Sequence, residues 1–459
     1  MEKKKTLFGN GKFYGMALSL AVPIMIQQLI QSLVSLIDNF MVSGLGDVSM
    51  SGVNVAGQVL FCFMIYLNTI CMTGGIFLTQ FFGAAEKEGM QQAFRFKLIM
   101  GFAAFIPFFL VCMVYPRQVM SLLLIGNSEA GLILDEAVKY MRIVFFMGIP
   151  MTISVSIASS LRDMGDVKTP LYITVVATLT NTFFNYLLIY GNLGMPRLEV
   201  KGAAIATVIA RVVEVILFII IYIRKKPEFA FKIKETFKVD WPLFRRILKK
   251  GLMILFSEMV WVLSETLTTA IYNGRGGADV VSGMSSSFAI ANLFFVSFAG
   301  IYSATGVILG KTLGEGNIEK ARRESIWLRS GAFIFGIFMT FFGLATTLLI
   351  PVVFSRLSLS AIGIIKNMVI LMAAFMPVWV CMNAQMAIAR AGGDTAMGTY
   401  TDASLTIFLM IPMVLILGIY TKCGPVMLYG LVKCIDVIKI VVFRIWLKKE
   451  RWLKNLTVA

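Results

Sequence analysis

The chain has 459 residues, of which 58% are hydrophobic and 15% are charged, and its mean hydropathy is +0.83. These values exclude an ordinary soluble protein. The net charge of +17 comes largely from basic residues in short segments between apolar runs, which argues against nucleic acid as a partner, and the absence of histidine excludes histidine metal ligands and histidine acid–base chemistry.

Apolar runs recur along the whole chain, each long enough to cross a bilayer, which takes about 20 helical residues. Because lipid cannot satisfy backbone polar groups, each run predicts a helix. The fold class predicted is therefore an all-α polytopic membrane protein. The twelve predicted transmembrane helices are 15–40, 51–78, 94–115, 132–160, 169–190, 202–223, 251–272, 280–310, 326–350, 361–389, 398–419 and 425–447.

The first predicted helix contains Asp38 without a basic residue near it in sequence. A carboxylate at bilayer depth is costly and is often functional. Gln27, Gln31, Ser35 and Asp38 share one helical face by their spacing. We therefore predict Asp38 as an ion-coupling residue, with Gln31 and Ser35 as substrate contacts. The alternative is a hydrated or hydrogen-bonded Asp near the outer end of the helix.

The fifth and sixth predicted helices carry two polar pairs. Asn181 and Asn185 are one turn apart, and their amide oxygens could help coordinate Na⁺ together with Asp38 or bond Asp38 directly. Structural hydrogen bonding between helices is the alternative. Arg211 and Glu214 are an i, i+3 pair of opposite charge, which predicts a structural ion pair within the helix.

The connection 224–250 is rich in basic residues interleaved with aromatic ones. Asp240 is suited to cap a short amphipathic helix that follows it. The pattern is consistent with a surface element that binds anionic lipid and equally with a plain linker whose side chains reach the interface.

The seventh predicted helix contains Glu258 and Glu265 on one face, again without a nearby cation in sequence. Glu258 is a second ion-coupling candidate, and Glu265 is a candidate substrate contact. In the last predicted helix, Lys433 and Asp436 repeat the spacing of Arg211 and Glu214, so we interpret them as a second structural pair.

The chain contains an internal sequence repeat. Arg-x-x-Gly-Asp occurs at 162–166 and again at 390–394, Gly83 pairs with Gly314, and Gly75 pairs with Gly306. The repeat predicts two pseudo-symmetric six-helix bundles with a transport pathway between them. The predicted boundaries are an N-terminal bundle at 1–224, a basic cytoplasmic linker at 225–250 and a C-terminal bundle at 251–459.

Basic residues concentrate on one side of the predicted membrane. They include Lys3, Lys4, Lys5 and Lys12, the linker, and the residues after 443, whereas the opposite connections hold few, among them Arg117, Arg197 and Arg356. The positive-inside rule therefore predicts both termini in the cytoplasm. The first apolar run is too long for a signal peptide and is kept as a helix. We expect a bacterial plasma (inner) membrane.

The chain resembles the multidrug and toxic compound extrusion (MATE) family over nearly its whole length. The motifs that carry the resemblance are Ala21-Val22-Pro23 with Asp38, Thr79-Gln80-x-x-Gly83, the segment 161–170, Asn181-x-x-x-Asn185, and Gly202-Ala-Ala-Ile-Ala-Thr207. The resemblance implies two six-helix bundles around a central cavity and antiport of drugs against H⁺ or Na⁺. It maps an ion-coupling role onto Asp38, Asn181, Asn185, Thr207 and Glu258.

The chain departs from the family pattern at two places. The family often has an Asp where this chain has Asn185, and the acidic residue of the tenth helix is missing, because 367–389 contains no Asp or Glu. The coupling ion, H⁺ or Na⁺, therefore stays open.

The function predicted is a secondary active antiporter that exports organic cations or amphipathic drugs by alternating access. The alternative is a flippase for a lipid-linked saccharide or another amphipathic lipid. An enzyme is not expected, because no nucleophile has a base nearby and no metal-ligand spacing occurs. We expect no cofactor beyond the coupling ion, small-molecule substrates and the lipid bilayer as partners, and a monomer.

Overall fold

The computed structural model describes residues 7–124, 129–354 and 357–458, and these residues form helices and no strand. Lys3, Lys4, Lys5 and Arg356, which enter the orientation prediction, lie outside the described residues. The all-α membrane fold class predicted from the sequence is confirmed.

Contacts divide the chain into two compact units. We call residues 26–78 and 86–247 the N-terminal unit, and residues 1–25, 79–85 and 248–459 the C-terminal unit. The division falls inside three helices, α1 (Gly11–Ser43), α2 (Asp47–Gly83) and α9 (Trp241–Asn273). The boundaries predicted from the repeat, at 224 and 251, stay a prediction.

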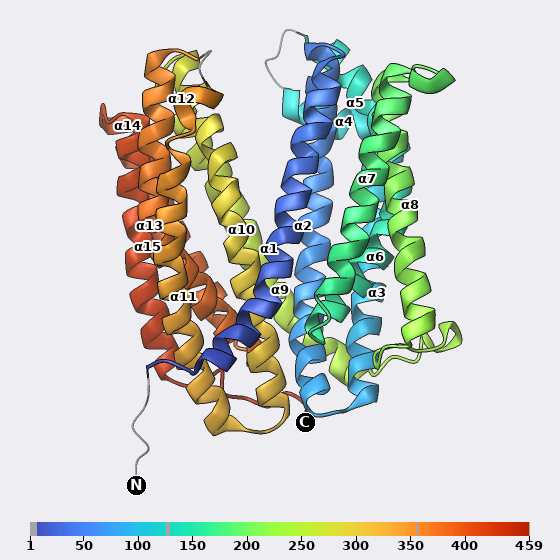
Figure 1. Cartoon of the computed structure of the whole chain (residues 1–459), viewed down its shortest axis with the longest axis vertical. Coiled ribbons are helices and arrows are strands. Elements are labelled where there is room, and N and C mark those ends of the chain that lie inside the picture. The colour runs from blue at the N-terminus through green and yellow to red at the C-terminus, as the bar shows by residue number, and fades with distance from the viewer. Residues whose placement is uncertain (1–6, 125–128, 355–356, 459) are drawn as a thin grey trace. The chain divides into compact units, whose positions relative to one another are not determined.

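The N-terminal unit is completed by α3 (Lys87–Phe109), a wider π-helical turn η1 (Leu110–Val114), the short α4 (Pro116–Ser121), α5 (Ala130–Val144), α6 (Gly148–Asp163), α7 (Lys168–Tyr190) and α8 (Glu199–Lys225). Figure 1 shows α7 and α8 side by side, and they are in extensive contact. This contact places the polar residues of α7 and α8 in one neighbourhood.

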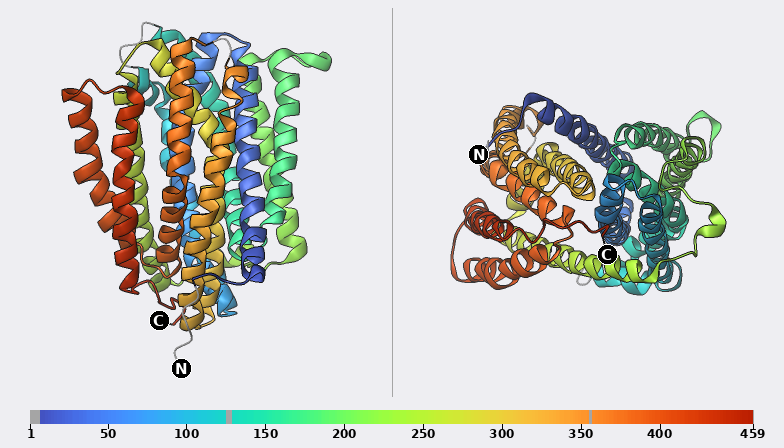
Figure 2. Two further views of the ribbon diagram at one scale, coloured as in Figure 1. Left: turned by 60° about the vertical axis from the view of Figure 1, so that its left-hand side comes forward. Right: turned by 90° about the horizontal axis from the view of Figure 1, so that it is seen from below.

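The C-terminal unit contains α10 (Ala278–Gly314), α11 (Ile318–Thr346), the single turn α12 (Ile350–Val353), α13 (Leu359–Ala391), the π-helical segments η6 (Gly398–Ala403) and η7 (Thr406–Met410), α14 (Ile411–Tyr420) and α15 (Pro425–Lys448). α13 packs against α10, α11 and α15. Figure 2 shows α14 and α15, in red, as neighbours.

Among the described residues, ten helical segments are long and apolar enough to cross a membrane. They comprise α1, α2, α3 with η1, α5 with α6, α7, α8, α10, α11, α13, and the run from η6 to α14. α9 and α15 have 33 and 24 residues and carry several ionisable side chains. With these two, the helices follow the twelve predicted segments.

The repeated Arg-x-x-Gly-Asp motif is a helix stop. Gly165 and Gly393 have φ values of +88° and +72°, in the left-handed region that glycine adopts without a Cβ clash. The following amides close the turn, with Asp166 N donating to Leu161 O and Asp394 N to Ala389 O, both at 2.9 Å. This is the 6→1 bond of a Schellman motif, so the repeat ends α6 and α13 in the same way.

A proline inside α13 leaves one backbone carbonyl without its helical donor. Pro377 has no N–H, so the carbonyl of Ala373, four residues earlier, loses its usual partner. Thr340 of α11 donates its hydroxyl to that carbonyl at 2.8 Å. A neighbouring helix thus satisfies the group that lipid could not.

Gly83 and Gly314 are equivalent positions of the repeat. Gly83, at the end of α2, contacts α10, and Gly314, at the end of α10, contacts α2. A Cβ added at Gly83 would lie 2.1 Å from the Lys311 carbonyl oxygen, and one at Gly314 would lie 1.9 Å from that of Gln80. The two backbones therefore touch directly, and only glycine fits at either position.

The connection after α8 packs on the N-terminal unit. Phe229 is fully buried, with its ring 4.7 Å from that of Phe94, and the Arg95 guanidinium lies 4.7 Å from the centre of the Phe231 ring.

Asp240 caps the next helix by accepting from Leu243 N at 3.2 Å. That helix is α9 itself and not a separate short helix, which corrects the sequence prediction. Phe237 stays 88% exposed.

Candidate functional site

Asp38 is held by two amides of α7 in the N-terminal unit. Nδ2 of Asn185 donates to Asp38 Oδ1 at 2.6 Å. With its amide in the orientation that fits its neighbours, Nδ2 of Asn181 lies 2.9 Å and 3.1 Å from the two Asp38 oxygens. The spacing of one turn on α7 aims both side chains at one point on α1. The three residues that the sequence grouped are therefore brought together.

The amide oxygen of Asn185 is buried and has no hydrogen-bond partner among the described residues. A buried carbonyl oxygen without a donor is costly, so it is available to a proton donor or a cation. Its position on the residue that also bonds Asp38 adds a neutral oxygen to this carboxylate's surroundings.

The nearest cation to this group already has a partner. Arg211 interacts electrostatically with Asp38, but its guanidinium donates to Glu214 at 2.7 Å, which is the ion pair predicted from the sequence. Thr207, one turn before Arg211 on α8, donates its hydroxyl to the Ala203 carbonyl of the same helix at 3.0 Å. The predicted ion-coupling role of Thr207 therefore stays a prediction.

The predicted polar face of α1 is divided in the structure. Gln27 is buried and donates to the Thr174 hydroxyl at 2.7 Å, so it serves packing between α1 and α7. Gln31 and Ser35 are exposed, and the Ser35 hydroxyl donates a hydrogen bond to the Gln31 backbone carbonyl at 3.1 Å. Their predicted role as substrate contacts stays a prediction.

Glu258 is paired, although no cation is near it in sequence. Arg390 of α13 lies 3.1 Å from Glu258 Oε1, with Tyr302 of α10 beside the same guanidinium. Arg390 is the arginine of the second Arg-x-x-Gly-Asp motif. The motif therefore contributes a charge partner as well as a helix stop.

Glu265 and Lys433 form an ion pair, whereas the sequence analysis pairs Lys433 with Asp436. Lys433 Nζ lies 2.8 Å from Glu265 Oε1, across from α15 to α9. Asp436, the predicted partner of Lys433, instead accepts the indole N–H of Trp379 at 2.8 Å. The predicted Lys433–Asp436 pair is therefore wrong, because a side chain on the facing helix approaches Lys433 more closely than the one three residues along.

Two further buried charge pairs were missed from the sequence. Lys97 of α3 is fully buried and lies 2.6 Å from Asp163. Lys439 of α15 lies 2.9 Å from Asp402, which belongs to η6. A charged residue inside an apolar run was the available signal for Lys97, Asp402 and Lys439, but their partners lie on other helical segments.

Long apolar helices that carry ionisable side chains in their interior define a polytopic membrane protein, and in such proteins these side chains often mark a transport pathway. Residues 23–187 and 254–416 match the family model described as MatE, which covers more than half of the sequence. The chain therefore belongs to the MatE family, as the resemblance indicated. Members of this family are transporters and not enzymes.

Bacterial proteins are among the relatives. The chain is 24% identical to "Uncharacterized transporter YisQ" of Bacillus subtilis over 71% of each chain. It is 25% identical to "Probable multidrug resistance protein NorM" of Thermotoga maritima over 66% of this chain and 64% of that protein. The match thus spans about two thirds of these relatives.

Solved structures of the same fold cover almost the entire chain. A MATE protein crystallised in the straight conformation superposes with a TM-score of 0.83 at 20% identity, over 97% of each chain. The outward-facing conformation of a multidrug resistance MATE family transporter gives 0.82 at 18% identity, over 99% of this chain and 98% of that one. At these identities the likeness shows the fold.

Proposed function

We propose that the chain is a secondary active antiporter that exports organic cations or amphipathic drugs in exchange for H⁺ or Na⁺. Two relatives, from Thermotoga maritima and Halalkalibacterium halodurans, are named probable multidrug resistance proteins. The membrane fold and the site around Asp38 supply the chemical support for ion coupling. No observation favours the alternative of a lipid flippase.

The charge balance around Asp38 carries the proposal. Glu214 already compensates Arg211, so the three ionised groups Asp38, Arg211 and Glu214 carry one negative charge together. Amides stabilise that charge by hydrogen bonds without neutralising it. One monovalent cation or one proton restores neutrality at this depth.

The ligands suit either coupling ion. Asp38 accepts a proton directly, while its carboxylate and the unpartnered amide oxygen of Asn185 offer hard oxygen ligands of the kind that Na⁺ requires, and the Asn181 oxygen joins them when its amide turns over. Either ion removes the charge that the two amides hold, so the free and loaded forms favour different packing of α1 against α7. This difference in affinity is what shifts the equilibrium between transport states.

Glu258 and Glu265 are weaker coupling candidates, because each already has a cation within 3.1 Å. Glu265 remains a proposed substrate contact on its open side, since its side chain is 28% exposed. Gln31 and Ser35 are the corresponding proposed contacts on α1.

We place the protein in the bacterial plasma membrane as a monomer with both termini in the cytoplasm. The basic linker and C-terminal segment support this orientation through the positive-inside rule. The proposed partners are small molecules and lipid, and no nucleic acid.

The decisive experiment is dye transport by proteoliposomes under a pH gradient alone and then a sodium gradient alone. The gradient that drives transport identifies the coupling ion. Asp38→Asn keeps the size and hydrogen-bonding capacity of the side chain and removes the charge, so we expect gradient-driven transport to be lost while the protein remains folded.

Asp135→Asn is the matched control, because Asp135 is a carboxylate of the same unit whose ion pair with Arg117 lies on the protein surface. We expect it to transport as the parent does. Retained gradient-driven transport in Asp38→Asn would rule out Asp38 as the coupling carboxylate.

A further inference from the structure

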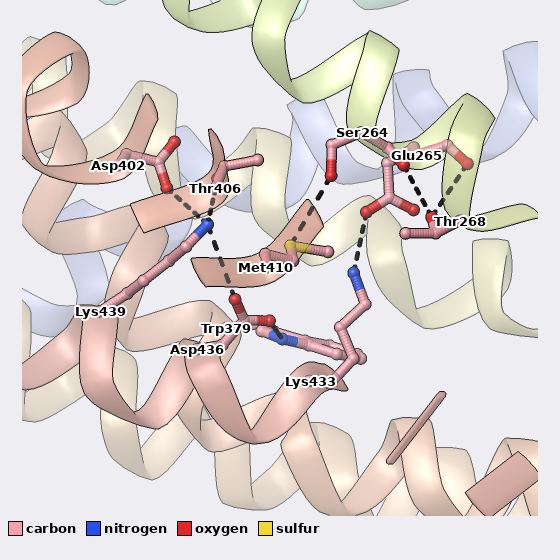
Figure 3. A network of polar contacts seen from close by, with 10 residues as sticks. All are labelled: Ser264, Glu265, Thr268, Trp379, Asp402, Thr406, Met410, Lys433, Asp436 and Lys439. Atoms are coloured by element: carbon pink, nitrogen blue, oxygen red, sulfur yellow. Dashed lines mark hydrogen bonds and ion pairs between the residues drawn. The ribbon is translucent and has the colours of Figure 1, made fainter. Parts of the chain in front are cut away.

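The ammonium group of Lys439 lies in a cage of oxygen atoms in the C-terminal unit (Figure 3). It is 2.9 Å from Asp402 Oδ1, 2.8 Å from the Thr406 hydroxyl and 3.9 Å from Asp436 Oδ1. The Lys439 side chain is 6% exposed. One cation is thus surrounded by two carboxylates and a hydroxyl, as a bound alkali-metal ion would be.

The cage is held by groups that do not take part in balancing Lys439. The indole N–H of Trp379 on α13 donates to the second oxygen of Asp436 at 2.8 Å, which holds that carboxylate of α15 toward α13. Lys433, the other lysine of the network, has its own partner in Glu265 at 2.8 Å. Lys439 is therefore the lysine that lies within ion-pair distance of both Asp402 and Asp436.

The segment that supplies two of the oxygen atoms is irregular. Asp402 belongs to η6 and Thr406 begins η7, the two π-helical stretches before α14. π-helical turns are rare and frequently mark functional sites. The departure from a regular helix coincides with the residues that bind Lys439.

The N-terminal half has no equivalent of this lysine. Arg211 and Glu214 correspond to Lys433 and Asp436, and the same register places Leu217 opposite Lys439. In the N-terminal half the uncompensated carboxylate is Asp38, which has amides and no ammonium around it. The two halves therefore differ in whether a cation is built into the chain.

We propose that Asp402, Thr406 and Asp436 form a monovalent-cation site whose permanent occupant is the ammonium group of Lys439. A lysine ammonium is a compact, strongly hydrated point charge with three donors, and here it takes the place of a free ion. Being tethered, it does not exchange with solution. The cation of this cage is therefore built into the chain, whereas at Asp38 it has to come from solution, a contrast that rests on the proposed function.

Removing Lys439 should convert the cage into a site for free Na⁺. The test uses the purified full-length chain carrying Asp38→Asn, so that the proposed coupling site does not respond. In this background Lys439→Gln is compared across NaCl concentrations, with choline chloride holding the ionic strength constant. We expect its thermal midpoint to rise by about 3 °C or more at saturating Na⁺, because a ligand that binds only the folded state stabilises it.

Lys433→Gln is the matched control. It removes a buried lysine of the same helix, whose only carboxylate within ion-pair distance in the described part of the chain is Glu265. We expect its thermal midpoint, like that of the background, to be independent of Na⁺. Binding of ²²Na⁺ by Lys439→Gln, and its loss when Asp402→Asn is added, would confirm the ligands.

A sodium response equal in both lysine variants, or absent from Lys439→Gln, overturns the proposal. If Lys439→Gln does not fold in choline chloride, recovery in NaCl supports it. Lys439→Ala, which leaves room for a free cation, is then purified in ammonium or methylammonium chloride. Failure to recover either variant in any of these salts overturns the proposal. These binding readouts do not depend on the proposed transport activity.

Discussion

At the scale of single residues, the carboxylates of the long helices differ in the kind of group that holds them. Asp38 is bound by neutral amides and Glu258 and Glu265 by cations, while Asp436 has both an indole N–H and the Lys439 ammonium, 3.9 Å away. An amide stabilises a charge and leaves it uncompensated, whereas a cation cancels it. This difference singles out Asp38 as the carboxylate that an incoming cation can neutralise.

Asp166, in the connection between α6 and α7, gives a pH-dependent prediction. Partial burial alone would raise its pKa, but hydrogen bonds from Thr169 and Lys225 outweigh burial and hold the pKa below its ordinary value of 3.8. Since folding lowers this pKa, the ionised Asp166 stabilises the folded state at pH values above the ordinary pKa. This stabilisation is lost as the pH falls through the lowered pKa.

We therefore expect Asp166→Asn to lower stability at pH 7 by about 1 kcal/mol or less, because the Lys225 side chain is half exposed. The difference between the two proteins should shrink below about pH 4. Thermal unfolding in detergent between pH 3 and pH 7 measures it. A difference that is constant over this range would contradict the assignment.

The grouping of Asp38 with Asn181 and Asn185 could be predicted, because each is a conspicuous polar residue in an apolar run. The partners of Glu258 and Glu265 could not. Arg390 and Lys433 are on other helices, and each seemed explained by its own local pattern, a repeated motif in one case and a nearby Asp in the other. Sequence spacing reports neighbours along one helix, whereas ion pairs form across helices.

At the scale of helices, the structure places small and polar residues where backbones need them. Thr340 satisfies the carbonyl that Pro377 frees, and Gly165 and Gly393 end their helices in the left-handed conformation. The helix stops follow from the sequence motif, since glycine with a following Asp is a local signal. The Thr340 bond does not, because it joins residues of two helices.

The crossing of α2 and α10 predicts opposite effects for two glycines of one helix. Gly314→Ala places a Cβ 1.9 Å from the Gln80 carbonyl oxygen, so the helices have to separate. Overpacking of this kind costs about 1–3 kcal/mol. Gly306→Ala meets nothing within 4 Å and should stabilise α10 by about 0.5–1 kcal/mol.

Thermal unfolding of the two variants in one detergent compares them directly. The sign is the informative result, because both replace glycine by alanine in α10. Equal effects would show that helix propensity and not the close approach governs both positions.

At the scale of the whole molecule, the two halves share the same order of helices, and they differ in which helix positions carry charged residues. The twelve segments and the family could be read from the sequence, because hydropathy and repeated motifs are local properties. The division of contacts into two units could not, since α1, α2 and α9 each contribute to both.

The proposed orientation can be tested at the two ends of α8. Leu193, before this helix, is 81% exposed, and Phe237, after it, is 88% exposed. In a variant without the six natural cysteines, a membrane-impermeant maleimide added to intact cells should label Leu193→Cys and not Phe237→Cys. Phe237→Cys should react only after permeabilisation. The reverse pattern would place the linker outside.

The meeting of Gly83 and Gly314 bears on how a duplicated gene can diverge. A side chain on either glycine would collide with the other copy's helix, so each copy limits what the other can become at this point. Charges such as Asp38 and Lys439 have no such reciprocal constraint, and each half was free to acquire its own. Mutational drift after duplication is therefore restricted where the copies touch and permitted at positions such as Asp38 and Lys439.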